Sequence, residues 1–124
     1  MNRLLTLTAV IEAATGLTLM AVPSVVVRLL LGSEIAGSSI ALGRVAGFGL
    51  LSLGIACWPG RGPADNAAPA LRAMLTYNSL ATLYLLCLGI GREWVGPLLW
   101  PAVALHGVLA VLLARQWRLQ NRSQ

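Results

Sequence analysis

Residues 71–90 read LRAMLTYNSLATLYLLCLGI and contain a single charged side chain, Arg72, at the second position. An α-helix needs about 20 apolar residues to cross a hydrocarbon core about 30 Å thick. This stretch has that length and composition, so it predicts a transmembrane helix. Hydrophobic residues make up 57% of the chain and charged residues only 10%, whereas about a quarter of an average globular sequence is charged. We therefore expect an integral membrane protein.

Three further apolar stretches have a similar length, and the four predicted spans are residues 4–22, 39–58, 71–90 and 97–114. Prolines and glycines in PGRGPADNAAP (59–69) predict a loop between the second and third spans. Glu12 interrupts the first stretch and three spans follow it, so we expect a retained helix rather than a signal peptide. The fold class is all-α: residues 1–124 form one transmembrane domain, a four-helix bundle, with a polar cytoplasmic tail (115–124) that frays.

The segment PSVVVRLLLG (23–32) is too short to cross a membrane. Pro23 suits the first turn of a helix, and Arg28 is the only charge. Two interpretations remain open at this point. The segment forms either a short helix at the membrane interface or an extension of the first span.

The arginines predict the orientation of the chain. One side of a four-span topology carries six of them: Arg3, Arg61, Arg72, Arg115, Arg118 and Arg122. The other side carries Arg28 and Arg92, each with a glutamate (Glu34, Glu93) in its loop. Arginine in short loops marks the cytoplasmic side, so both termini are expected to be cytoplasmic. The tryptophans also lie near predicted span ends, as amphipathic rings at the headgroup level do.

Each predicted span contributes one polar residue that is costly in lipid: Glu12, Arg44, Asn78 and His106. Such residues usually face the bundle interior and find partners there. At 1.5 Å rise per residue, Glu12, Asn78 and His106 lie about 10–13 Å from the cytoplasmic ends of their spans, and Arg44 about 21 Å. Because an arginine side chain is long, we expect all four to form one cluster around a Glu12–Arg44 pair.

Neighbouring polar and small residues support this inward orientation. Thr8, Glu12 and Thr15 share a helix face, Asn78 and Thr82 are one turn apart, and Tyr77 adjoins Asn78. Gly43, Gly47 and Gly54 form a small-residue face that includes GxxxG, a pattern equally typical of packing within the bundle and of a homodimer. The cluster has two interpretations. Either it fixes the register of the helices, or it is a ligand or proton site that is supported by Thr8, Thr15, Tyr77 and Thr82.

No motif for hydrolytic or nucleophilic catalysis or for phosphate binding is present, so no catalytic residue is assigned. The single histidine does not provide a metal site. Cys57 and Cys87 fall at opposite ends of adjacent spans, which excludes a bridge between them, and we expect both to be buried. Arginines that flank spans indicate orientation, so nucleic acid is not an expected partner.

Two family resemblances arise from these residues. The central Glu12, the pattern Pro23-x-x-x-x-x-Leu-Leu-Leu-Gly32 and Arg44-x-x-Gly47 resemble the DoxX-like group over nearly the whole chain. These small bacterial membrane proteins are four-helix bundles, and the resemblance implies that architecture and a bacterial inner (cytoplasmic) membrane. The run EAATGLTLM (12–20) resembles the first span of small multidrug resistance transporters, whose embedded glutamate binds protons and cationic drugs. The third span lacks the expected Trp-x-Gly-x-Gly, and Arg44 would neutralise the glutamate.

The sequence therefore favours a non-enzymatic membrane protein. It would bind a lipid-like or quinone-like ligand at the polar cluster, or act as an accessory or assembly subunit of a larger membrane complex. One alternative is a small proton-coupled transporter of hydrophobic or cationic compounds that uses Glu12. A second is a component of a quinone-linked membrane oxidoreductase. No cofactor is identified beyond the quinone or lipid, and membrane lipids or a second copy of the chain are the expected partners.

Overall fold

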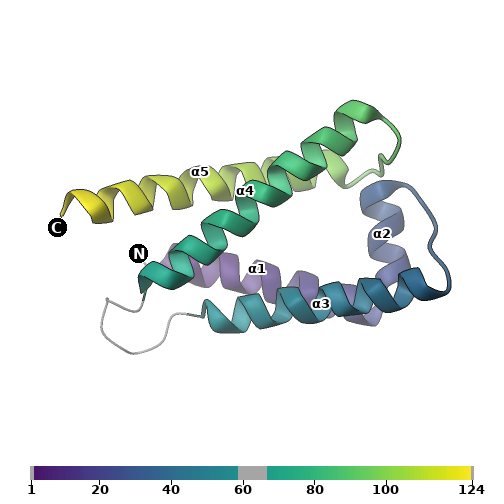
Figure 1. Cartoon of the computed structure of the whole chain (residues 1–124), viewed down its shortest axis with the longest axis horizontal. Coiled ribbons are helices and arrows are strands. Elements are labelled where there is room, and N and C mark those ends of the chain that lie inside the picture. Colours follow the sequence, from purple (N-terminus) through teal and green to yellow (C-terminus); the bar gives the residue numbers. More distant parts are fainter. Residues whose placement is uncertain (1, 59–66, 124) are drawn as a thin grey trace.

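The computed structural model describes residues 2–58 and 67–123, which form five α-helices (Figure 1). They are α1 (Asn2–Ala21), α2 (Pro23–Leu31), α3 (Ser38–Ala56), α4 (Ala67–Gly91) and α5 (Leu99–Arg122). By length and composition, α1, α3, α4 and α5 can each cross a membrane. The predictions of an all-helical chain and of four apolar spanning helices are confirmed.

Two helices run beyond the predicted spans. α4 begins at Ala67, inside the predicted loop, and its Pro69 lies in the first turn, where a backbone N–H is not needed. The rest of that loop, residues 59–66, lies outside the described residues. α5 continues to Arg122, so the prediction of a fraying tail is wrong up to that residue. The cause is tertiary: Trp117 packs against the core, and the Arg72 guanidinium lies 5.5 Å from its ring centroid.

The short segment after the first span is a separate helix, α2, and not an extension of α1. Pro23 occupies its first position, and Gly32 ends it with a left-handed φ of 69° while donating its N–H to the Arg28 carbonyl. α2 lies across the direction of the long helices (Figure 1). The connection between α4 and α5 docks on it, because the N–H groups of Gly96 and Leu98 donate to the Leu30 and Leu29 carbonyls.

α1 and α3 form a tightly packed pair whose backbones touch at glycines. A Cβ added at Gly16 would lie 2.7 Å from the Gly47 carbonyl oxygen, and one at Gly47 would lie 2.7 Å from the Gly16 oxygen. Gly54 makes the same kind of approach to Ala9, at 2.7 Å. Since no side chain fits in these gaps, the glycine face of α3 packs against α1 within the same chain. Gly43 also faces inward, against Pro23.

α4 and α5 form the second pair. Gly89 accommodates the Trp100 ring, which an added Cβ would meet at 2.9 Å, and Thr82 approaches Gly107. The exposure of the two cysteines differs: Cys57 is buried and Cys87, on α4, is exposed. The expectation that both are buried is wrong for Cys87, because only Leu85 and Gly89 of that stretch turn inward toward neighbouring side chains. Both thiols are free.

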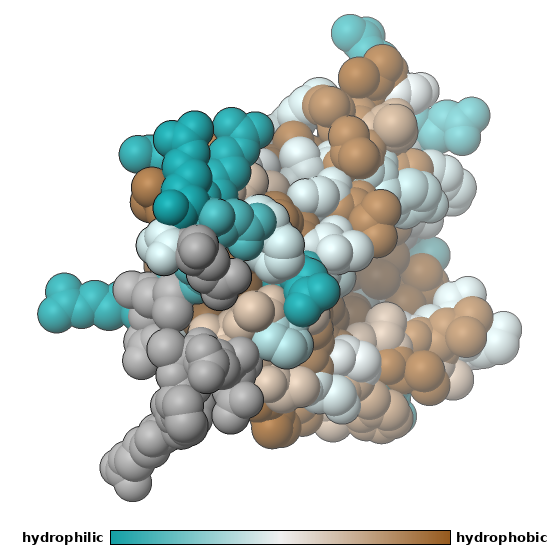
Figure 2. All heavy atoms as spheres, turned by 60° about the vertical axis from the view of Figure 1, so that its left-hand side comes forward, coloured by the Kyte–Doolittle hydropathy of each residue, from teal (hydrophilic) through white to brown (hydrophobic). Residues whose placement is uncertain are grey.

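The two pairs meet in a core at the end that carries both termini. Its buried residues come from α1, α4, α5 and the residue that follows α3: Leu5, Ala9, Cys57, Leu71, Met74 and Leu113. From this end α4 diverges from the α1–α3 pair, and α2 stands at the opposite end (Figure 1). Figure 2 turns the termini end forward and shows hydrophilic residues gathered there. Exposed arginines of α4 and α5, Arg72, Arg115, Arg118 and Arg122, belong to this end.

The close approach of α1 and α3 makes a direct prediction. Gly47→Val should lower the free energy of unfolding by about 1–3 kcal/mol, because the added side chain must push the α1 backbone away. Gly49→Val is the matched control: it lies on the same helix, and an added Cβ there meets no atom within 4 Å. Unfolding in mixed detergent micelles, followed by circular dichroism, measures both variants. Equal destabilisation of the two would contradict the packing described here.

Candidate functional site

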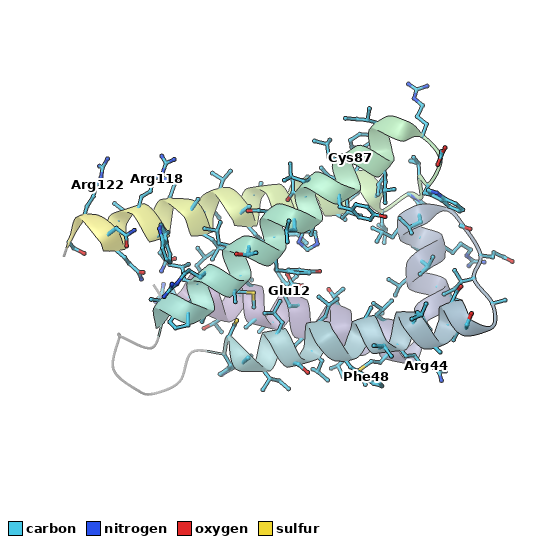
Figure 3. All side chains as sticks on the ribbon, viewed as in Figure 1. Glu12, Arg44, Phe48, Cys87, Arg118 and Arg122 are labelled. Atoms are coloured by element: carbon cyan, nitrogen blue, oxygen red, sulfur yellow. The ribbon has the colours of Figure 1, made fainter. Side chains whose placement is uncertain are left out.

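Three of the four predicted polar residues come together between the two helix pairs. Glu12 of α1 and Asn78 of α4 are fully buried, and His106 of α5 joins them with a side chain 13% exposed. The His106 Nδ1 atom lies 2.8 Å from Asn78 Oδ1 and 4.0 Å from Glu12 Oε1. Figure 3 places Glu12 near the middle of the molecule, on the side of α1 that faces α4. We refer to Glu12, Asn78 and His106 as the polar triad.

The hydrogen bond between Asn78 and His106 fixes the roles of both side chains. Asn78 Nδ2 donates to the Met74 carbonyl at 3.0 Å, so its Oδ1 faces the imidazole. An amide oxygen only accepts, which means that His106 Nδ1 carries the proton and donates it. In a neutral ring the other nitrogen, Nε2, is then an acceptor. The Tyr77 ring packs edge-on against the imidazole, with centroids 5.8 Å apart and planes at 83°.

Glu12 has a different environment from the other two members of the triad. Neither carboxylate oxygen has a hydrogen-bond partner among the described residues, although the Asn78 side chain lies beside it. The nearest ionisable group is His106, at 4.0 Å, which is longer than a hydrogen bond. A buried carboxylate is stable only when nearby groups compensate for the hydration it has lost. Both oxygens are enclosed and lack a hydrogen-bond donor among the described residues.

Arg44 does not join the triad. Its side chain is exposed on α3, and Glu12 makes no ion pair with an arginine in the part of the chain that the structure describes. Figure 3 shows the two residues well separated, with Arg44 toward the α2 end of α3. Two causes act together. Arg44 lies on the flank of the face that Gly47 and Gly54 turn toward α1, and it is close to the far end of its helix. The expected Glu12–Arg44 pair is therefore absent.

The four residues predicted to support the site fall into two groups. Tyr77 contacts His106 as described, whereas the hydroxyls of Thr8, Thr15 and Thr82 each donate to carbonyls of their own helix. Thr8 is fully buried one turn from Glu12, but its hydroxyl bonds to Leu4 and Leu5 instead. Thr15 is exposed. A threonine hydroxyl that donates to a carbonyl of its own helix has no second proton to donate to a neighbouring helix.

Two further residues lie beside the site, and neither has a residue type that marks it as polar in the sequence. Met74 is fully buried one turn before Asn78 and accepts its hydrogen bond through the backbone. Cys57 is buried at the end of α3, and its thiol lies 3.7 Å from the Ala70 carbonyl and within electrostatic range of Glu12. Both positions read as ordinary apolar residues in a span. Only the packing of α3 and α4 brings them to this place.

Comparison with protein-family models, with curated proteins and with solved structures finds no match to this chain. The class of the protein therefore follows from its own residues. The four candidate spanning helices indicate a multi-pass helical membrane protein, and its distinguishing feature is the buried polar triad.

The Asn78–His106 bond predicts which polar residues matter for stability. Asn78→Leu should lower the free energy of unfolding by about 1–3 kcal/mol, because it leaves the His106 Nδ1–H group without its acceptor. Thr82→Val, one turn along the same helix, removes a hydroxyl that bonds only to its own backbone. Its effect should be within about 0.5 kcal/mol. Detergent-induced unfolding of the two variants provides the comparison, and a Thr82→Val loss as large as that of Asn78→Leu would contradict this assignment.

Proposed function

We propose that this protein is a multi-pass protein of the bacterial cytoplasmic membrane that binds a lipid-like or quinone-like molecule at its polar triad. The observation that carries the proposal is the state of Glu12. Its side chain is fully buried, at the junction of three helices, and neither oxygen has a hydrogen-bond partner among the described residues. Ionisable residues within transmembrane segments commonly mark substrate, ion or proton sites.

The chemistry of the triad narrows the class of ligand. Asn78 Oδ1 already accepts from His106, and Asn78 Nδ2 already donates to Met74. The remaining polar groups are the Glu12 oxygens and His106 Nε2, which accept hydrogen bonds, and the second N–H of Asn78 Nδ2, which lies beside Glu12. Because acceptors predominate, the proposed head group donates, as the hydroxyls of a reduced quinone or the amine of a lipid do. A fully oxidised quinone offers only carbonyl acceptors and fits less well.

A ligand that enters from the bilayer would pass between the two helix pairs. The pairs are joined by the apolar core at the termini end and by the contact of α2 with residues 96–98 at the other end. The triad lies between these two junctions, and His106 is its one partly exposed member. A hydrophobic molecule from the bilayer would reach Glu12 past His106, between the pairs.

The proposed orientation rests on charge. Arginine is concentrated at the end that carries both termini, whereas Arg28, Arg44 and Arg92 lie toward the opposite end with Glu34 and Glu93. The rule that cytoplasmic loops are rich in arginine supports cytoplasmic termini, with α2 at the opposite interface. Membership of the DoxX-like group and a role as an accessory subunit of a larger membrane complex remain part of the same proposal. The exposed apolar side chains of α3, such as Leu42, Val45 and Ile55, suit either lipid or a partner helix.

A second candidate is proton-coupled transport of a hydrophobic cation, and the position of Arg44 favours it. An arginine paired with Glu12 would neutralise the carboxylate that such transport needs. Because Arg44 is exposed and apart from Glu12, that objection does not hold. Transport differs from simple binding in that net movement across the membrane must depend on Glu12 and on a proton gradient.

The binding proposal is tested with two probes that share one hydrophobic tail, decylubiquinol and decylubiquinone. The purified protein in detergent should bind the quinol more tightly, because only the quinol donates to Glu12. Glu12→Gln should weaken quinol binding about ten- to hundredfold, the value of a hydrogen bond to a charged group. Arg44→Gln is the control and should bind as the wild type does. Isothermal titration measures all four cases. Equal affinity for the two probes, or unchanged binding by Glu12→Gln, would refute the proposal.

The transport candidate has its own test. Proteoliposomes with an imposed proton gradient should take up tetraphenylphosphonium if the protein is a transporter. Glu12→Gln should abolish that uptake and Glu12→Asp should retain it, because an aspartate preserves the exchangeable carboxylate. Glu93→Gln removes an exposed carboxylate in the connection between α4 and α5 and serves as the matched control. Uptake that persists in Glu12→Gln, or is absent from the wild type, would exclude the candidate.

A further inference from the structure

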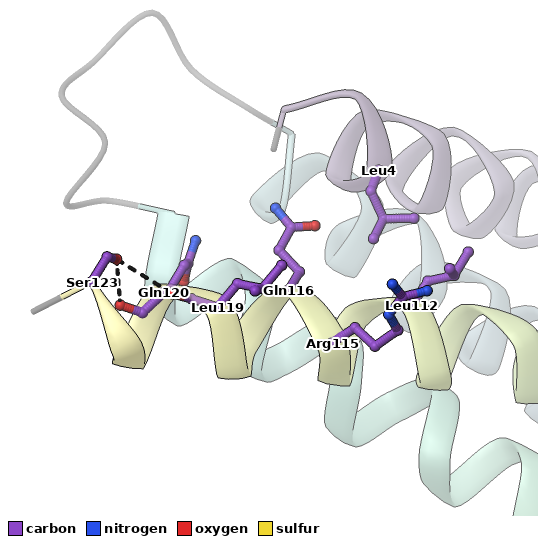
Figure 4. Close-up of a pocket in the computed structure, with 7 residues that line it drawn as sticks. All are labelled: Leu4, Leu112, Arg115, Gln116, Leu119, Gln120 and Ser123. Atoms are coloured by element: carbon purple, nitrogen blue, oxygen red, sulfur yellow. Dashed lines mark hydrogen bonds between the residues drawn. The ribbon is translucent and has the colours of Figure 1, made fainter.

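A groove lies between the start of α1 and the last turns of α5, far from the polar triad (Figure 4). It has a volume of about 610 Å³ and is lined by Leu4, Leu112, Arg115, Gln116, Leu119, Gln120 and Ser123. Figure 4 shows Leu4 projecting from α1 toward α5 and Gln116 projecting from α5 toward α1. This surface is independent of the function proposed for Glu12.

One basic residue, Arg115, lines the groove. A smaller hollow adjoins it and is lined by Arg115, Arg118, Leu119 and Arg122, so Arg115 and Leu119 belong to both. The three arginines are spaced i, i+3 and i+7 and therefore share one helix face. Figure 3 shows Arg118 and Arg122 projecting on the same side of α5. All three are exposed, and none forms an ion pair within residues 2–58 and 67–123.

The described carboxylates do not offset this charge. Glu12 is enclosed between the helix pairs, and Glu34 and Glu93 lie in connections at the other end of the molecule. Three guanidinium groups on one helix face match the oxygens of a phosphate.

The groove also has an apolar wall, and this distinguishes a lipid from a free anion. Leu4, Leu112 and Leu119 line the groove, and Leu119 is 65% exposed on the same helix face as the arginines. An inorganic phosphate would gain nothing from these leucines. A phospholipid would place its acyl chains against them while its phosphate contacts the arginines.

The depth of the groove in a bilayer fits the same occupant. α5 has 24 residues and is about 36 Å long, which exceeds the hydrocarbon core of about 30 Å. The excess of about 6 Å, roughly one turn, places Arg122 at the level of the lipid headgroups, and the long side chains of Arg115 and Arg118 reach toward that level. Leu112 precedes Arg115 by three residues and lies within the hydrocarbon.

We propose that this groove is a specific site for one anionic phospholipid. Arg115, Arg118 and Arg122 bind its phosphate, and Leu4, Leu112 and Leu119 hold the first part of its acyl chains. Charge selects an anionic headgroup over a zwitterionic one, and the leucines select a lipid over a soluble anion.

The test is native mass spectrometry of the protein in detergent with phosphatidylglycerol or phosphatidylcholine added. The wild type should retain one phosphatidylglycerol in preference to phosphatidylcholine. The triple variant Arg115→Gln/Arg118→Gln/Arg122→Gln should lose that preference, by about fivefold for each arginine removed. Arg28→Gln/Arg44→Gln/Arg92→Gln changes the net charge equally by replacing three exposed arginines elsewhere, and it should retain the preference. If the triple variant does not fold, Arg118→Gln alone should show the single fivefold step.

Three results would overturn the proposal. The first is equal retention of the two lipids by the wild type. The second is an equal loss of phosphatidylglycerol in the two triple variants, which would reduce the effect to net charge. The third is displacement of the lipid by millimolar inorganic phosphate. That displacement would show that the leucines contribute nothing to lipid binding. Failure of this site would leave the Glu12 proposal unaffected, since quinol binding is measured separately.

Discussion

The contact of the α1 and α3 backbones at Gly16, Gly47 and Gly54 is the constraint on which the remaining arrangement depends. Each glycine leaves space that a neighbouring backbone fills at 2.7 Å or less from where a Cβ would be. Such an approach permits one register and one pair of facing surfaces, because any shift brings a side chain into the gap. Glu12 lies one turn before Gly16, at the edge of this contact, and is thereby directed toward the second helix pair. The same contact places Arg44 on the outer flank of α3.

Side-chain hydrogen bonds, rather than backbone contacts at glycines, organise the polar triad. Asn78 commits its oxygen to His106 and one N–H to Met74, and Glu12 accepts no hydrogen bond among the described residues. A triad built only to fix helix register would gain from closing this last bond, since an unsatisfied buried carboxylate costs stability. The threonines nearby add nothing, because their hydroxyls are satisfied within their own helices. The lack of a hydrogen-bond donor for Glu12 is therefore the chemical reason for proposing that a ligand binds here.

The two ends of the molecule differ in how they hold the pairs together. The termini end is joined by an apolar core, reinforced by Trp117 beneath Arg72. The opposite end is joined by backbone hydrogen bonds from Gly96 and Leu98 to α2. Gly96 is required there because an added Cβ would collide with the Leu29 carbonyl. Basic residues concentrate beside the apolar core, so the groove proposed to hold a phospholipid and the site proposed for Glu12 belong to separate regions of the chain.

The four spanning helices could be predicted from the amino-acid sequence, because hydrophobic length and helix-breaking residues act locally. It also identified Glu12, Asn78 and His106 as inward residues, since polar groups are excluded from lipid by their cost in hydrogen bonds. It could not decide that Arg44 lies outside, that α5 remains helical to Arg122, or that the helices associate as two pairs. Those outcomes depend on glycine contacts and on the packing of Trp117 between residues far apart in the chain. Depth along a helix is set by the 1.5 Å rise, but the direction in which a residue faces is set by the helix packed against it.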